Sequence, residues 1–228
     1  DFVINRIHAL VEGGSARSEV AILYRSNAQS RVFEEALLNA GMPYRVYGGL
    51  RFFECAEIKD ALAYLRLVSN RDNDPAFERV VNLPTRGIGA RTLDVIRSDA
   101  RANTRSLWRA AGAALSDGLN QRAGSAVTKF LQLIELMARD TSELPLHEQV
   151  EHVIHASGLI DHHGRDKGEK GEGRVENLRE LVSAARGFEP APDSEMAPLD
   201  EFLSHAALEA GEGQADEWED CVQLMTLH

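Results

Sequence analysis

A glycine-cornered segment in the first half of the chain has the residue types best suited to binding phosphate. It reads Pro84-Thr85-Arg86-Gly87-Ile88-Gly89-Ala90-Arg91-Thr92. A Gly–hydrophobic–Gly turn between two helices exposes backbone N–H groups at the start of the second helix. These groups, together with the helix dipole, can bind one phosphate without reading a base sequence. We expect Ile88 to anchor the turn in the core.

The stretch that begins with this turn is also rich in positive charge. From Pro84 to Arg109 it holds six arginines and two aspartates, which gives a local charge of +4 in a chain whose formal charge is −11. The arginines are Arg86, Arg91, Arg97, Arg101, Arg105 and Arg109, and the acids are Asp94 and Asp99. Turn and charge together predict a hairpin of the helix-hairpin-helix type, which binds duplex DNA. The alternative is a glycine-containing connection between two helices.

A second polar group, Arg25-Ser26-Asn27, follows a short apolar run at 19–24 that predicts a strand. In open α/β sheets, ligands bind at the carboxyl edge of the strands. The side chains of Arg, Ser and Asn carry donors that suit phosphate oxygens or base edges. The alternative is an ordinary strand-to-helix turn in which Ser26 or Asn27 caps the helix.

The segment from Tyr44 to Glu54, YRVYGGLRFFE, mixes cations with aromatic rings. Single-strand binding proteins use such a mixture, because bases stack on the rings while the cations contact the backbone. The alternative is a domain junction packed by aromatic side chains, and the two interpretations are compatible.

The rest of the sequence lacks the motifs of a self-sufficient active site. It contains no GxxxxGK[ST] and therefore no nucleotide-binding P-loop, and it contains no HExxH or Cys/His cluster for zinc. The adjacent residues His162 and His163 would point to different sides of a helix, and the pair Glu34-Glu35 is no acid/base dyad. We expect neither a catalytic residue nor a metal ligand in this chain.

The spacing of apolar residues predicts the elements that position these groups. A helix is expected over 2–11, and a strand, a helix and a second strand over 19–24, 28–40 and 44–47. From residue 54 nearly every segment has helical spacing, and 221–227 is expected to be a strand. The helices expected in between are 56–69, 75–81, 92–102, 106–115, 121–138, 146–156, 174–185 and 198–210.

Two loops are expected to interrupt the helices, a charged glycine-rich one over 166–173 and a proline-rich acidic one over 188–196. The simplest architecture is a mostly α chain in which an all-helical domain is inserted into an incomplete α/β domain. The chain would leave the α/β domain near residue 50 and return to it near residue 220.

Composition is that of an ordinary globular protein, with 228 residues, 43% hydrophobic and 27% charged. The whole negative charge lies from Glu189 to His228, where eleven acids occur without a Lys or Arg, so the rest of the chain is neutral. An acidic average therefore does not exclude a DNA site on the neutral part. Only two cysteines occur, and neither a membrane span nor a signal peptide is recognisable, so we expect a cytoplasmic protein.

Several long motifs together resemble the UvrD/Rep/PcrA family of bacterial superfamily 1 DNA helicases, and within it the UvrD branch most. They are VAILYRSNAQSR (20–31), YRVYGGLRFFE (44–54), EIKDALAYLRL (57–67), NLPTRGIGARTLD (82–94), LSHAALEAGEG (203–213) and VQLMTLH (222–228). The family has two RecA-like motor domains of the P-loop NTPase type, 1A and 2A, each with a helical insertion, 1B and 2B. The resemblance implies that residues 1–50 and 220–228 belong to 2A and residues 51–219 to 2B, in a fragment cut from a larger protein.

The resemblance also implies an activity for the parent protein. ATP, with Mg, would be hydrolysed between 1A and 2A and would drive 3′-to-5′ movement on single-stranded DNA, in nucleotide excision repair and mismatch repair. The nucleotide-binding motifs lie outside this chain, so the piece is expected to need no cofactor and to be inactive as an ATP hydrolase by itself. Its expected partner is a junction of duplex and single-stranded DNA, bound as a monomer, with repair proteins as possible further partners and no membrane.

Residue roles follow from the resemblance position by position. Arg25, Asn27 and His228 resemble single-strand contacts of 2A, although the Ser-Ala-Lys-Gly-Leu-Glu expected after His228 is missing. The residues expected to contact duplex DNA are Lys59, Arg66, Thr85, Arg86, Gly87, Ile88, Gly89, Arg91 and Thr92. The alternative function is a regulatory or autoinhibitory module that binds partners and has little DNA affinity of its own.

Overall fold

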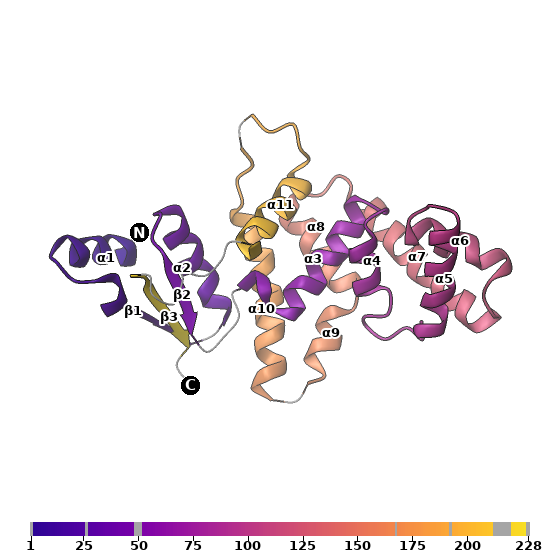
Figure 1. The fold of residues 1–228 in the computed structure, drawn as a ribbon, viewed down its shortest axis with the longest axis horizontal. Helices are drawn as coiled ribbons and strands as arrows, with labels where there is room; N and C mark the ends of the chain where they lie inside the picture. The colour runs from indigo at the N-terminus through magenta and orange to yellow at the C-terminus, as the bar shows by residue number, and fades with distance from the viewer. Residues whose placement is uncertain are drawn as a thin grey trace. The chain divides into compact units, whose positions relative to one another are not determined.

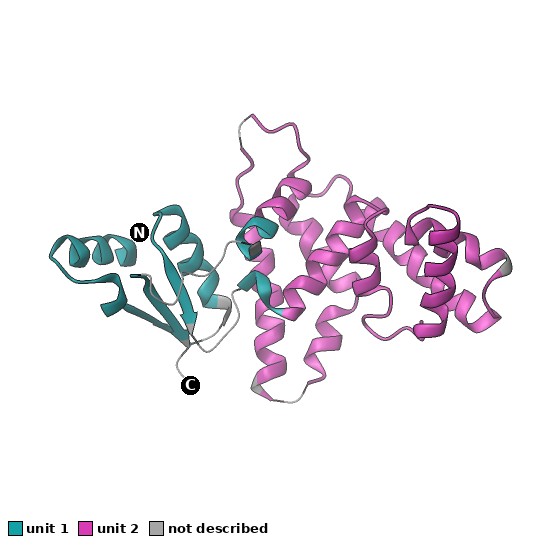
Figure 2. Cartoon of the chain, viewed as in Figure 1, with its two compact units in different colours: residues 1–55, 206–228 teal, residues 56–205 magenta. Residues whose placement is uncertain are grey.

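The computed structural model describes residues 2–25, 27–47, 52–166, 168–191, 193–211 and 220–226. These residues are mostly helical and include one small parallel sheet (Figure 1). The chain forms two compact units, one made of residues 1–55 and 206–228 and the other of residues 56–205 (Figure 2). The expected fold class, mostly α with an incomplete α/β portion, is confirmed.

The first unit contains the sheet, whose strands are β1 (Ala21–Tyr24), β2 (Tyr44–Tyr47) and β3 (Val222–Thr226). All pairs are parallel and the order is β1-β3-β2, so the last strand of the chain lies between the first two. In the register of the sheet, Leu224 is opposite both Ile22 and Val46. The two ends of the chain therefore build one sheet, as the sequence predicts for an interrupted α/β domain.

Helices α1 (Phe2–Glu12) and α2 (Asn27–Asn39) cover one face of this sheet. Their core consists of eight buried residues: Ile7, Ile22, Tyr24, Leu37, Met42, Val46, Val222 and Leu224. In β1, Ile22 and Tyr24 are buried while Leu23 is 51% exposed, so among the described residues this strand is buried on one face only. Burial of Tyr24, and secondarily the nearby Glu34 carboxylate, raise the pKa of its phenol to about 12.

The second unit is helical throughout its described residues. Its helices are α3 (Ala56–Ser69), α4 (Asp74–Val80), α5 (Ala90–Ala102), α6 (Leu107–Asp117), α7 (Gln121–Thr141), α8 (Leu146–Ala156), α9 (Leu159–Gly164) and α10 (Glu169–Gly187); α11 (Pro198–Gly211) begins in it. Helix α3 packs against α4, α7, α8, α9 and α10. It is buried on nearly every side, which is typical of a central helix.

Part of the expected glycine-rich loop over 166–173 is helical, because α10 begins at Glu169. A Cβ atom on Gly171 would lie 2.1 Å from the backbone oxygen of Asp166. Glycine at this position therefore allows the first turn of α10 to approach the preceding chain closely. The described residues contain no helix that is long and apolar enough to cross a membrane.

Candidate nucleic-acid interface

The glycine-cornered segment forms a tight turn between α4 and α5, which we call the hairpin (residues 81–92). Two backbone N–H groups, those of Arg86 and Ile88, donate to the side-chain oxygen of Asn82 at 2.8 and 3.1 Å. The side chain of Ile88 is 1% exposed, as the sequence predicts for the anchor of the turn. Gly87 has a φ of +83°, in the left-handed region that favours glycine. The hairpin is thus held from inside, by one apolar anchor and one side-chain acceptor.

The opposite side of the hairpin is open to solvent. Gly87, Gly89, Ala90 and Arg91 are all exposed, and no atom lies within 4 Å of the place that a Cβ would take at either glycine. Gly89 is the N-cap of α5, and its carbonyl accepts the N–H groups of Thr92 and Leu93. Within the ranges that the structure describes, the N–H groups of Gly89, Ala90 and Arg91 have no hydrogen-bond acceptor. These three amides at the start of a 13-residue helix can bind a phosphate oxygen.

Most of the arginines that follow the hairpin are paired with carboxylates. Arg97 lies 2.6 Å from Glu78 and 3.4 Å from Asp94, Arg105 lies 2.7 Å from Asp99, and Arg109 lies 2.7 Å from Asp72. Asp72 and Glu78 precede the segment in which the arginines were counted. The local charge of +4 therefore overstates the positive potential near the hairpin, because acids from before Pro84 neutralise part of it.

Two arginines of the segment remain available to a ligand. Arg91 and Arg101 are exposed, and neither forms an ion pair with another residue in the described part of the chain. Arg91 is the second residue of α5 and adjoins the free amides of the hairpin. Its side chain is the cation of the segment best placed to accompany a phosphate bound there.

Arg86 differs from Arg91, because its guanidinium points into the protein. It donates hydrogen bonds to the backbone oxygens of Val80, Pro84 and Ser157 at 3.3, 3.0 and 3.1 Å. It also lies over the rings of Tyr64 and Phe130, with the guanidinium carbon 5.7 and 5.6 Å from their centroids.

The other duplex-contact candidates lie within the same unit. Thr85 is exposed and Thr92 is partly exposed, both within the hairpin. On α3, Lys59 is exposed while Arg66 is partly buried, and burial followed by the positive charge of Arg79 lowers the pKa of Arg66. The structure thus gathers seven of the nine candidates, from Thr85 to Thr92, in one turn and places the other two on α3.

Two of the single-strand candidates, Arg25 and Asn27, follow strand β1 of the first unit. Arg25 is exposed directly after β1, and its backbone N–H donates to the Gln29 side chain at 3.0 Å. Since β3 runs parallel to β1, the chain leaves both strands at the same edge of the sheet, as the sequence argument requires. The side chain of Asn27 and the whole of His228 lie outside the described residues.

The aromatic part of the YRVYGGLRFFE segment is packed inside the protein. Phe52 and Phe53 are 1% and 5% exposed and meet edge to face with their centroids 5.1 Å apart. The backbone N–H of Phe52 donates to Glu34 at 3.3 Å. These two rings are therefore covered by protein and offer no stacking surface, while residues 48–51 lie outside the described ranges.

A buried polar cluster on α3 was missed by the sequence analysis. Glu57 and Asp60 are 5% and 6% exposed, although both stand in an otherwise apolar helix. Glu57 accepts a hydrogen bond from Asn177 at 2.6 Å, and Asp60 pairs with Arg79 at 2.7 Å and lies 3.7 Å from the ring of His163. The signal that could have found it is the presence of two acids on the buried side of a helix. Buried carboxylates require partners, which α4, α9 and α10 supply here.

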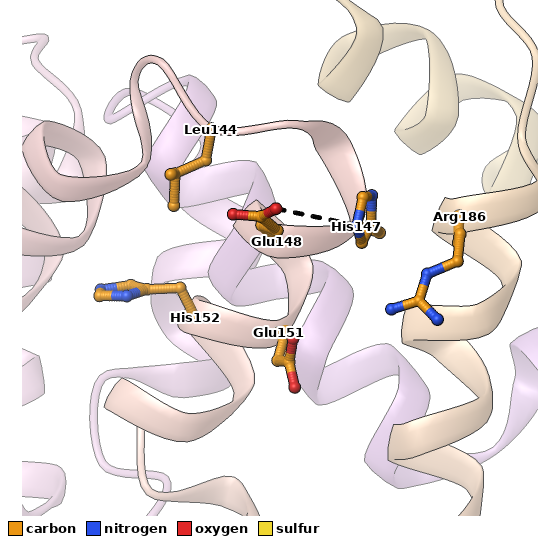
Figure 3. A pocket seen from close by; sticks show the side chains of 6 residues that line it. All are labelled: Leu144, His147, Glu148, Glu151, His152 and Arg186. Atoms are coloured by element: carbon orange, nitrogen blue, oxygen red, sulfur yellow. Dashed lines mark ion pairs between the residues drawn. The ribbon is translucent and has the colours of Figure 1, made fainter.

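A surface hollow of about 420 Å³ lies between α8 and the end of α10 (Figure 3). It is lined by Leu144, His147, Glu148, Glu151, His152 and Arg186. Figure 3 shows Arg186 extending toward the turn of α8 that carries His147 and Glu151. Two carboxylates and one guanidinium line it, together with two imidazole rings and the side chain of Leu144. The described residues hold no cluster of His, Cys, Asp and Glu that could bind a metal ion.

Comparison with known proteins gives a match along the whole chain. The family model described as UvrD-like helicase C-terminal domain matches residues 1–228. The chain is 59% identical to DNA helicase II of Escherichia coli (strain K12) and 53% identical to DNA helicase II of Haemophilus influenzae, covering all of this chain and 32% of each relative. It is 40% identical to the ATP-dependent DNA helicase PcrA of Bacillus subtilis, covering all of this chain and 31% of that relative.

The chain therefore spans about a third of the length of these relatives. The family model matches every residue of the chain, and the identity to these relatives is high, so the family is established. The chain belongs to the UvrD-like helicase C-terminal domain family.

Proposed function

We propose that the chain is part of an ATP-dependent 3′-to-5′ DNA helicase of the UvrD type and binds the sugar-phosphate backbone of DNA. The observation that carries this proposal is the hairpin, whose free amides at the start of α5 face solvent beside Arg91. The names of the relatives, DNA helicase II and ATP-dependent DNA helicase PcrA, support it. Backbone amides recognise phosphate without reading bases, which suits a protein that must act on any sequence.

In this proposal the two units correspond to the motor domain 2A and its insertion 2B. Residues 1–50 and 220–228 would form part of 2A, and residues 51–219 would form 2B. The pairing of β1 with β3 supports one α/β domain built from both ends of the chain. The compact helical unit over 56–205 supports an inserted domain.

The proposed contacts divide between the two units. In the second unit, the free amides from Gly89 to Arg91, which follow the turn at Gly87, and the side chains of Thr85, Arg91 and Thr92 contact duplex phosphates, with Ile88 as the anchor beneath them. Lys59 and Arg66 on α3 add cationic contacts. In the first unit, Arg25, Asn27 and His228 contact single-stranded DNA at the carboxyl edge of the sheet.

The motor itself lies in the remainder of the protein. ATP and Mg would bind there, and this piece would carry no cofactor and no catalytic residue. It would act as a monomer in the cytoplasm at a junction of duplex and single strand, in nucleotide excision and mismatch repair with partner repair proteins. Its part of the work is to hold DNA while the motor moves it.

A salt titration with forked DNA tests the DNA contact. Backbone contacts release counterions, so log Kobs should fall linearly with log[salt], by about 0.9 per phosphate contact. The double variant Gly89→Asp with Thr92→Ala places a carboxylate at the proposed phosphate site and should lose most of the binding. Affinity that is indifferent to salt, or equal in the variant and the wild type, would contradict the proposal.

A second candidate function is a regulatory module with little DNA affinity of its own. The observation that favours it is the neutralisation of Arg97, Arg105 and Arg109 by carboxylates. Deleting residues 56–205 from the full-length protein separates the two functions. DNA unwinding that persists or increases favours the regulatory module. Unwinding that is lost favours duplex binding by this unit as a requirement for unwinding.

A further inference from the structure

The carbonyl groups that Arg86 contacts come from the ends of two helices. Val80 is the last residue of α4, and Ser157 is the C-cap of α8. The last carbonyls of a helix have no partner within the helix, and they carry the negative end of its dipole. One guanidinium therefore donates to carbonyls at the C-terminal ends of two helices, a position in which a cation is favourable.

Two aromatic rings complete the environment of the guanidinium. Tyr64 and Phe130 come from α3 and α7, and both side chains are fully buried. A planar guanidinium stacks on such faces, while its N–H groups reach sideways to acceptors. The Tyr64 hydroxyl donates to the backbone oxygen of Leu83, next to the Pro84 oxygen that accepts from Arg86. Tyr64 and Arg86 therefore both bind the backbone at the start of the hairpin.

These contacts connect the hairpin to helices far away in the sequence. Ser157 is separated from Arg86 by 71 positions. The next residue, Gly158, also touches the hairpin, since a Cβ on it would lie 3.7 Å from the Pro84 ring. The N–H of Arg86 donates to Asn82, which receives the N–H of Ile88 as well. The position of Arg86 therefore determines where the open amides begin.

We propose that Arg86 is a positioning residue: its guanidinium does not bind phosphate but fixes the hairpin against the ends of α4 and α8, so that the amides after Gly87 are held ready for DNA. The inference rests on the proposed DNA binding by the hairpin. It reverses the role expected for Arg86 from the sequence. To reach a phosphate, the side chain would have to give up three hydrogen bonds and two ring contacts.

Arg86→Lys is the informative variant, because it keeps the positive charge and removes the planar guanidinium with its several donor directions. An ammonium is a compact point charge that cannot stack as a plane or donate along the same three directions. The matched control is Arg91→Gln, which removes an exposed guanidinium five residues later in the same turn. Circular dichroism and urea unfolding show whether each variant is folded.

Amide hydrogen exchange in the chain provides a test that needs no DNA. In Arg86→Lys, exchange at the N–H groups of Arg86 and Ile88 should accelerate at least about tenfold, because the turn loses hydrogen bonds to a charged group. Exchange in the middle of α7 should not change, and Arg91→Gln should resemble the wild type at all these amides. Exchange that is equal in Arg86→Lys and the wild type would overturn the proposal.

DNA binding then separates positioning from direct contact. Arg91→Gln should reduce the slope of log Kobs against log[salt] by about 0.9, since one counterion-releasing contact is lost. Arg86→Gln should weaken binding at every salt concentration and leave that slope unchanged. A slope reduced by Arg86→Gln, or binding fully restored by Arg86→Lys, would mean direct contact and overturn the proposal.

Side-chain NMR of the wild-type chain covers the case in which Arg86 variants do not fold. The Nη–H signals of Arg86 should be resolved and slowly exchanging, and they should keep their positions when duplex DNA is added, while the Nε–H signal of Arg91 shifts. Averaged Arg86 signals, or signals that move with DNA, would contradict positioning. If the wild type binds no DNA, the proposed function fails, and exchange and the free-state signals still decide the role of Arg86.

Discussion

The side-chain oxygen of Asn82 accepts a hydrogen bond from the backbone N–H of Ile88 at 3.1 Å, across the hairpin. Ile88 itself is buried, so this bond joins the apolar anchor of the turn to a residue that lies just after the end of α4. The same oxygen accepts the N–H of Arg86 at 2.8 Å. One amide side chain therefore fixes the backbone on the inner side of the turn and leaves the outer amides free for a ligand.

Asn82→Ala should destabilise the helical unit by about 1–3 kcal/mol, because two partly buried N–H groups lose their acceptor. Urea unfolding measures the loss, and forked-DNA binding should weaken along with it. Asn120→Ala is the matched control. Asn120 caps α7 by accepting the Ala123 N–H, so its loss should cost about 1 kcal/mol but leave DNA binding unchanged. Equal effects of both variants on binding would argue against a special role for the hairpin.

The two glycines of the hairpin should respond differently to alanine. Gly87 has a φ of +83°, so Gly87→Ala should cost about 1–2 kcal/mol of stability. Gly89 has a φ of −86° and open space around it, so Gly89→Ala should cost only about 0.5 kcal/mol. Thermal unfolding compares the two variants. A Gly89→Ala variant that is as unstable as Gly87→Ala would mean that the N-cap geometry described here is wrong.

The path of the chain could be predicted from the sequence because it depends on local patterns. Apolar spacing located the strands and most helices, and the turn residues located the hairpin with Ile88 as its anchor. The expectation that both ends of the chain belong to one α/β domain followed from the switch between short apolar runs and long helical periods. These signals lie within windows of a few residues, where backbone preference and burial act together.

The charge of the candidate site could not be predicted in the same way. Arg109 meets Asp72 and Arg97 meets Glu78, and these acids stand 37 and 19 positions away. The guanidinium of Arg86 points inward to the backbone oxygen of Ser157, which is 71 positions away in the sequence. A count within one segment cannot include partners that only the packing of helices brings near. The same reason explains why the buried acids of α3 were missed.

The phenol of Tyr64 provides a test at alkaline pH. Burial raises the pKa of Tyr64 to about 12, against the lowering effect of Arg86. In the unfolded chain the phenol ionises near pH 10, so the folded state keeps this proton longer. The resulting stability is complete below about pH 10 and is lost as the pH rises toward 12, by up to about 1.4 kcal/mol per pH unit.

Tyr64→Phe should therefore flatten the decline of stability between about pH 10 and 12. Absorbance titration of the folded chain should show one fewer late-ionising tyrosine than the wild type. Tyr24→Phe is the control, because Tyr24 also titrates at about 12 but lies in the first unit. If Tyr64→Phe leaves the alkaline titration unchanged, the phenol of Tyr64 is not buried as described.

Asp72 provides the corresponding test at acid pH. Its carboxylate accepts hydrogen bonds from the Ser106 hydroxyl at 2.5 Å and from Arg109 at 2.7 Å, and these bonds, that of Ser106 first, lower the pKa of Asp72. A folded pKa below the unfolded value of about 4 gives stability that is present above pH 4 and lost as the pH falls through the folded pKa.

Asp72→Asn should consequently lower stability at pH 7 and change it less at an acid pH below the folded pKa of Asp72, where the wild-type carboxyl is protonated as well. Unfolding by urea at both pH values measures the difference. In Asp72→Asn the side-chain carbonyl oxygen still accepts the Ser106 hydroxyl, whereas the ion pair with Arg109 is lost. Asp161→Asn, on exposed α9 surface, controls for the change of charge. Parallel losses at both pH values in Asp72→Asn would show that ionisation of Asp72 is not the source of the stability.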